Sequence, residues 1–208
     1  DNDEGYSLDK MWIGFGVIQE SGAESFNIIM DNGDVLVPVV WDHYHSRDGN
    51  VYIDVVNHVE DGDRITVNYT VVDDDRNESG EIDTYYVKVN SLKSILMKGV
   101  MDITPENEDS IGNDPIIVKD YWMTDSLLTF KLKYWGYNAI HFLNLVKQPG
   151  DVLEANQPIQ LELRHNANDD DDAIPFTAFV SFSLNSLRIE GLDSVQFVVN
   201  AVDYDGGE

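Results

Sequence analysis

Cysteine is absent from the 208 residues of the chain, and basic residues are few. Without cysteine the chain offers no disulfide bond, no thiol nucleophile and no thiolate ligand for a metal. Its 13 Lys and Arg residues stand against 39 Asp and Glu residues, a formal net charge of −26. Because nucleic acids are bound chiefly by neutralising phosphates with Lys and Arg, a nucleic-acid partner is excluded. The simplest interpretation of this negative electrostatic field is that it promotes solubility.

Long apolar runs and helical periodicity are also lacking. No stretch approaches the roughly 20 apolar residues of a membrane-spanning helix, and no amphipathic helix of useful length is apparent. Hydrophobic residues nevertheless make up 42% of the chain and aromatic residues 11%, which is ample for a packed core and excludes global disorder. The length allows one large β domain or two domains of about 100 residues.

Period-two alternation, typical of half-buried strands, dominates the first half of the chain. After a flexible acidic leader at 1–10, it predicts strands at residues 11–19, 26–30, 35–39, 64–71 and 82–97. Gly14 and Gly16 share one face of the first strand and predict a bend or a close backbone approach, and Asn32-Gly33 predicts a tight hairpin turn. Five strands, the first long and bent at glycine, indicate an OB-type β-barrel at residues 11–103. An SH3-like barrel would give nearly the same pattern.

A second domain is predicted at residues 104–208. Residues 104–115 are acidic, carry two prolines and lack periodicity, so the domain boundary is placed just before them. Alternation returns at 128–134, 140–146, 159–163, 178–184 and 195–201. Several short strands separated by polar turns are typical of a β-sandwich. The chain is therefore expected to be all-β, a five-stranded OB-type barrel followed by a C-terminal β-sandwich.

Many stretches, in order along nearly the whole chain, resemble the NigD-like protein family. In the first half these are residues 6–10 before the Trp12 strand, 31–34, 61–69 and 87–90. In the second half they are residues 109–115, 134–138, 141–145, 163–166 and 180–182. The resemblance implies an OB-type N-terminal domain and a C-terminal β-sandwich on a lipoprotein. The family is named from a gene neighbourhood linked to bacteriocin production, where an immunity role was proposed. No catalytic or ligand-binding residue is carried over from the family to this chain.

A lipid anchor is expected before the first residue. Asp1 is not a start methionine, the chain has no cysteine, and its first residues form an aperiodic tether. With the family resemblance, these features predict an apolar leader that ends in an acylated cysteine next to Asp1. The protein is then expected in the cell envelope of a Gram-negative bacterium, at the periplasm or the outer-membrane surface. This anchor would be its only membrane contact.

Aromatic residues in turns are the candidate ligand-binding residues. Trp41 and Tyr44 flank the loop after the third predicted strand, a rim from which OB-type barrels often bind ligands. Trp135 and Tyr137 lie in a predicted turn of the second domain. Exposed aromatic rings stack on sugars or anchor protein partners. The alternative is that each ring folds back over its own core.

The acidic loop at 166–172 is a weak candidate for a calcium site, through Asp169, Asp170, Asp171 and Asp172. Calcium favours clustered oxygen ligands, but the EF-hand spacing is absent, and adjacent side chains splay apart in an extended loop. A solvated turn is the favoured interpretation, so neither a metal nor a cofactor is expected. The chain has no Gly-rich phosphate loop, no dinucleotide fingerprint and no Gly-x-Ser-x-Gly motif. No catalytic residue is therefore predicted.

These observations favour a non-catalytic envelope lipoprotein that binds another protein, with bacteriocin immunity as a candidate role. The alternative is a carbohydrate-binding accessory lipoprotein that uses the turn aromatics, and an unrecognised hydrolase is the third class. The partner is thus expected to be an envelope protein or a glycan. His165 is expected to end a strand by hydrogen bonding.

Overall fold

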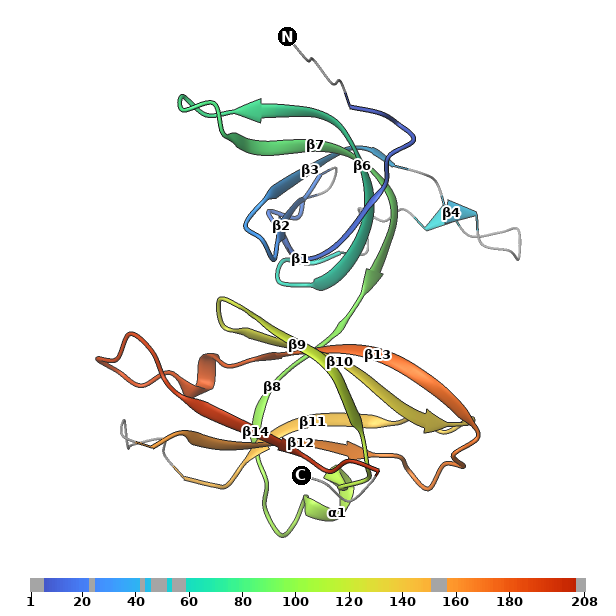
Figure 1. The fold of residues 1–208 in the computed structure, drawn as a ribbon, viewed down its shortest axis with the longest axis vertical. Coiled ribbons are helices and arrows are strands. Elements are labelled where there is room, and N and C mark those ends of the chain that lie inside the picture. Colours follow the sequence, from blue (N-terminus) through green and yellow to red (C-terminus); the bar gives the residue numbers. More distant parts are fainter. Residues whose placement is uncertain are drawn as a thin grey trace. The chain divides into compact units, whose positions relative to one another are not determined.

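The computed structural model describes residues 6–22, 25–41, 44–45, 52–53, 59–150 and 157–204 (Figure 1). The chain divides into two compact units, Asp1–Ile95 and Leu96–Glu208, and almost every regular element in both is a strand. No helix within the described ranges is long and apolar enough to cross a membrane. The expected all-β class is confirmed.

The first unit is a closed β-barrel with the strand order β1-β2-β3-β7-β6. All neighbours pair antiparallel except β3 and β7, which run parallel. This closure confirms the expected five-stranded OB-type barrel. Two short strands, β4 and β5, form a separate ladder. The strands of this unit are β1 (Trp12–Gln19), β2 (Asn27–Met30), β3 (Val35–Trp41), β4 (Tyr44–His45), β5 (Tyr52–Ile53), β6 (Arg64–Arg76) and β7 (Ile82–Ser94).

Alternate residues of the barrel strands point inward and form its core. Ile28, Ile65 and Val67 are fully buried there, as the period-two pattern predicts. Gly16 allows the close approach expected of it, because a Cβ atom at that position would lie 2.8 Å from the carbonyl oxygen of Ile29. Gly33 has a φ of 92° in the turn between β2 and β3, a conformation that favours glycine.

A buried ion pair connects the β2–β3 turn to the start of β6. Arg64 is 1% exposed, and its guanidinium makes two contacts with the carboxylate of Asp31, one of them 2.6 Å long between Nη2 and Oδ2. The bidentate geometry fixes both side chains. This pair was not predicted from the sequence.

The second unit is a seven-stranded sheet with the order β14-β12-β11-β8-β13-β10-β9. Its strands are β8 (Leu96–Asp102), β9 (Ile117–Thr124), β10 (Leu127–Gly136), β11 (Phe142–Lys147), β12 (Ile159–Asn166), β13 (Ile174–Ser183) and β14 (Phe197–Ala201). The first residues of β8 pair with β13 and its last residues pair with β11. Sharing β8 lets the sheet fold into two layers, β9-β10-β13 and β11-β12-β14, around one apolar core (Figure 1). The expected β-sandwich is confirmed.

The boundary between the units lies at Ile95–Leu96, before the expected position at 103–104. The reason is that β8 pairs with β11 and β13, which both belong to the second unit. The acidic segment that follows is also part of this unit. It contains helix α1 (Glu108–Ile111), and Ile103 and Ile111 are buried against Val146. A short 3₁₀ helix, η2 (Asn185–Leu187), precedes β14.

Candidate functional site

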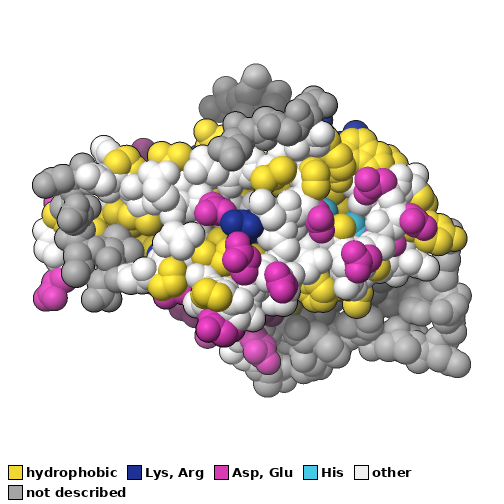
Figure 2. Space-filling view, turned by 90° about the horizontal axis from the view of Figure 1, so that it is seen from below, with side chains coloured by type: hydrophobic (Ala, Val, Ile, Leu, Met, Phe, Trp, Pro, Cys, Tyr) yellow, Lys and Arg dark blue, Asp and Glu magenta, His cyan; other side chains and the backbone are white. Residues whose placement is uncertain are grey.

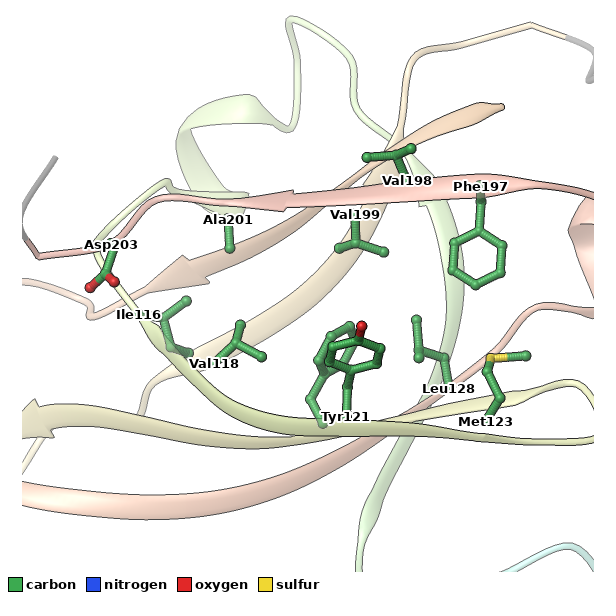
Figure 3. Close-up of a pocket in the computed structure, with 11 residues that line it drawn as sticks. Ile116, Val118, Tyr121, Met123, Leu128, Phe197, Val198, Val199, Ala201 and Asp203 are labelled. Atoms are coloured by element: carbon green, nitrogen blue, oxygen red, sulfur yellow. The ribbon is translucent and has the colours of Figure 1, made fainter. Parts of the chain in front are cut away.

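An apolar groove lies between the two edge strands of the described sheet, β9 and β14 (Figure 3). We call it the sandwich groove. Its volume is about 600 Å³, and it reaches the core residues Leu128 and Phe130. Phe197, Val199 and Ala201 point into it from β14. Its other lining residues are Ile116, Val118, Tyr121, Met123, Val198 and Asp203.

A β-bulge directs the side chains of β9 into the groove. Val118 pairs with Leu132 and Tyr121 with Phe130, so β9 has one more residue than β10 between these pairs. Without the extra residue, the odd spacing of Val118 and Tyr121 would place their side chains on opposite faces of the strand. The bulge keeps both on the inner face. It also explains why alternation did not predict β9.

One end of the sandwich groove is closed by the backbone and the other end is open. The Ile116 N–H donates to the Val202 carbonyl over 2.8 Å, which joins the segments next to β9 and β14. Towards the other end of β9 the apolar side chains reach solvent. Met123 is 46% exposed and Tyr121 67%. The arrangement can accept an apolar chain segment that enters from solvent.

A buried polar network lies beside the turn between β10 and β11. His141 Nδ1 is 2.8 Å from His165 Nε2, and His141 Nε2 is 3.1 Å from Asp170 Oδ2. His165 Nδ1 is 2.9 Å from the carbonyl oxygen of Pro115. Tyr134 packs on both imidazole rings, at centroid distances of 4.8 and 5.3 Å. The His165 ring is hydrogen-bonded, but His165 does not end its strand as expected, because β12 continues to Asn166.

The partners of the network determine how many protons it holds. The Pro115 carbonyl and the Asp170 carboxylate are acceptors, so each facing ring nitrogen carries a proton. The contact between the rings needs a third proton. Burial lowers the pKa of His165, because desolvation disfavours its charged form. All four ring nitrogens have partners, so neither histidine has one free to deprotonate a nucleophile.

The structure separates the four predicted ligand-binding aromatics. Trp135 lies on β10, not in a turn, and packs edge-on against Tyr204 at 4.8 Å. The backbone N–H of Trp135 donates to the Tyr204 hydroxyl, and Lys133 Nζ lies 4.4 Å from the centroid of the Trp135 ring. Tyr137 is 59% exposed in the turn after β10. The side chains of Trp41 and Tyr44 lie outside the described part of the chain. Ligand binding by these four residues stays a prediction.

The four acidic residues 169–172 do not all lie in a solvated turn. The Asp170 side chain is only 3% exposed, and its carboxylate accepts the N–H groups of Tyr137 and Asn138 as well as the His141 contact. The Tyr137 N–H, ahead of the Asn138 N–H and His141, lowers the Asp170 pKa far below its usual range. Asp170 thus stabilises the β10–β11 turn. Among the described residues, no three His, Asp or Glu side chains are placed to hold a metal ion.

Fold and groove together define the class: an all-β protein with a closed OB-type barrel followed by a β-sandwich whose edge strands enclose an apolar groove. Residues 99–208 match the family described as "NigD-like C-terminal beta sandwich domain". The chain belongs to the NigD-like family, and the recognition made from its sequence is confirmed. No curated protein matches the chain.

Solved structures of proteins from Parabacteroides and Bacteroides species share the fold. A protein of Parabacteroides distasonis named "Putative TOXIN related protein" has 27% identity and a TM-score of 0.72, covering 95% of this chain and 89% of its own. A NigD-like immunity protein of Bacteroides caccae has 19% identity and a TM-score of 0.63, with 97% and 91% covered. A Bacteroides fragilis protein named "Putative lipoprotein" has 11% identity and a TM-score of 0.56, with 86% and 80% covered.

Proposed function

We propose that the chain is a non-catalytic, lipid-anchored protein of the Gram-negative cell envelope that binds a protein partner through the sandwich groove. Bacteriocin immunity is the role we propose for this binding. The names of two structural neighbours, an immunity protein and a lipoprotein, support the proposal. The fully partnered histidines of the buried network support a non-catalytic function, because neither is free to act as a base.

The sandwich groove is the observation that carries the proposal. A contiguous apolar surface that reaches the core and stays open to solvent is typical of a protein-binding site. Tyr121 suits such a site because its ring offers a large apolar area and its hydroxyl a hydrogen bond, and tyrosine is enriched among residues that dominate binding energy. The occupant we propose is an apolar segment of a partner protein that inserts between β9 and β14.

The charge of the chain indicates the character of the partner's surrounding surface. Acidic side chains are spread over the face of the molecule seen in Figure 2, and basic ones are scarce there. With a formal charge of −26, the chain attracts a partner whose contact surface is basic around the apolar segment. Such steering is screened by salt, so association should slow as ionic strength rises while the inserted apolar contacts keep dissociation slow.

Photo-crosslinking in the native host tests the proposal. A benzophenone amino acid replaces Tyr121 in one strain and Lys119 in a matched strain, because Lys119 is the exposed extra residue of the bulge and does not line the groove. We expect one envelope protein to crosslink at position 121 and not at 119, and Met123→Asp to abolish that adduct. Adducts that are the same at both positions would refute the groove as the binding site.

A third strain separates this proposal from the earlier sequence-based one. With the same amino acid at Tyr137, the groove proposal expects no adduct to the partner. An adduct at 137 and none at 121 would instead place the partner at the β10–β11 turn, as the aromatic residues of that turn predict.

A further inference from the structure

A second cleft, rich in aromatic side chains, lies wholly within the barrel unit. We call it the barrel cleft. Its volume is about 600 Å³, and Tyr6, Trp12, Tyr69 and Tyr85 line it. Trp12 and Tyr69 are direct partners in the β1–β6 ladder, so their side chains lie on the same face of the sheet. Trp12 is 45% exposed and Tyr6 43%, so their rings are accessible to a ligand.

The N-terminal segment and the β2–β3 turn supply the polar part of the cleft. The Tyr6 hydroxyl donates to the carboxylate of Asp74, a bond that raises the pKa of Tyr6 to about 12 and ties the segment to β6. Asn32 and Asp34 come from the turn, where the Asn32 amide donates to Asp34 Oδ2 over 2.7 Å. The carboxylate and amide keep further capacity for hydrogen bonds.

Charged ligands fit the barrel cleft poorly. Lys10 Nζ lies 4.4 Å from the centroid of the Trp12 ring, so a cationic ligand would compete with the chain's own ammonium group for this ring. Anions meet the opposite difficulty. An anion would meet the carboxylate of Asp34, which lines the cleft, and that of Asp74, which accepts the Tyr6 hydroxyl. Burial, and then these two negative charges, raise the pKa of Tyr85.

A purely apolar ligand fits poorly too. It would cover Asn32, Asp34 and the tyrosine hydroxyls without satisfying their hydrogen bonds, at a free-energy cost for each buried polar group. What remains is a neutral molecule with apolar faces for the aromatic rings and hydroxyl groups around its edge. The volume lies within the range of about 300 to 1,000 Å³ typical of small-molecule sites.

We propose that the barrel cleft binds a neutral saccharide, with a sugar ring stacked on Trp12 and its hydroxyl groups hydrogen-bonded to Asn32 and Asp34. This site does not depend on the sandwich groove, so a negative result for one proposal leaves the other unaffected. It also differs from a saccharide site at the turn aromatics of the sandwich, because neither Trp135 nor Tyr137 lines the barrel cleft.

A glycan array followed by calorimetry tests the proposal on the full chain. The array holds neutral and acidic oligosaccharides of defined structure, and we expect binding among the neutral ones. The best neutral oligosaccharide is then titrated by isothermal calorimetry. Trp12→Ala should weaken binding about tenfold or more, equivalent to about 1.4 kcal/mol. The matched control is Tyr86→Ala, because Tyr86 neighbours Tyr85 on β7 but does not line the cleft. It should change the affinity less than twofold.

Three results would overturn the proposal: no neutral glycan bound above background, a preference for acidic glycans, or an affinity that Trp12→Ala leaves unchanged. If Trp12→Ala does not fold, Tyr6→Ala and Trp12→Phe carry the test. Tyr6→Ala, in the exposed N-terminal segment, should weaken binding, and Trp12→Phe should retain most of it because an aromatic ring remains. Equal affinities of these two variants would also refute the proposal.

Discussion

Removing Arg64 should destabilise the barrel strongly, because the Arg64 side chain is fully buried while that of Asp31 is 19% exposed. Breaking a buried ion pair by deleting one partner costs about 3–5 kcal/mol. Since water partly reaches Asp31, we expect about 3 kcal/mol for Arg64→Met, a substitution that preserves most of the side-chain volume. In a domain of this size, 1 kcal/mol lowers the melting temperature by about 4–8 °C. The barrel should therefore melt at least about 12 °C lower.

Tryptophan fluorescence can follow the barrel alone. Two of the four tryptophans belong to the barrel and two, Trp122 and Trp135, to the sandwich. In a background where both sandwich tryptophans are phenylalanine, the emission reports the barrel transition, which urea titration converts into a free energy. The double variant Arg64→Met with Asp31→Asn closes a double-mutant cycle and should cost clearly less than the sum of the single variants. The reasoning would be refuted if Arg64→Met lowered the free energy of unfolding by less than about 1 kcal/mol. It would also be refuted if the losses in the two single variants added up to the loss in the double variant.

Three further predictions concern the sandwich. Asp170→Asn should lower the melting temperature of the sandwich at pH 7. Because folding lowers the pKa of Asp170, its carboxylate stabilises the fold above the unfolded-state pKa of about 3.9, and this stabilisation is lost as pH falls towards the folded-state pKa. The melting temperatures of wild type and variant should therefore converge in acid. Gly136→Ala should cost about 1–3 kcal/mol in urea unfolding, since its Cβ would lie 2.7 Å from His141 Nε2, whereas Gly99→Ala, in open space, should be near neutral. Millimolar Ca²⁺ and Mg²⁺ should raise the melting temperature equally and slightly by screening; a Ca²⁺-selective rise of about 5 °C would indicate a site at residues 169–172.

The barrel and most sandwich strands could be predicted because their burial alternates with every residue. In β12, for example, Leu161, Leu163 and His165 are buried and their neighbours are not. Strand β8 gave no such signal, since it is shared between two layers and most of its side chains are exposed. The domain boundary was therefore placed too late. Strand β9 was missed because its bulge interrupts the alternation.

The candidate sites could be predicted less well, because each depends on contacts between residues far apart in the sequence. Nothing in an acidic run distinguishes Asp170 from its neighbours. Asp170 differs from its neighbours because its carboxylate contacts His141 and the Asn138 N–H of the β10–β11 turn. Likewise the pairing of Trp12 with Tyr69 requires the register of β1 against β6, which a pattern within one strand does not contain. Sequence alternation assigns a side chain to a face but does not identify its neighbours across the sheet.

The same bulge that hid β9 bears on how the sandwich groove would bind a partner. An exposed edge strand invites pairing with other strands, and bulges and charged residues on the edge oppose it. Here the bulge adds a residue at Lys119, next to Asp120, and both are exposed. Backbone pairing along β9 is thus interrupted, while Val118 and Tyr121 still face the groove. Binding should therefore depend on side chains that fill the groove, which favours a defined partner over indiscriminate strand addition.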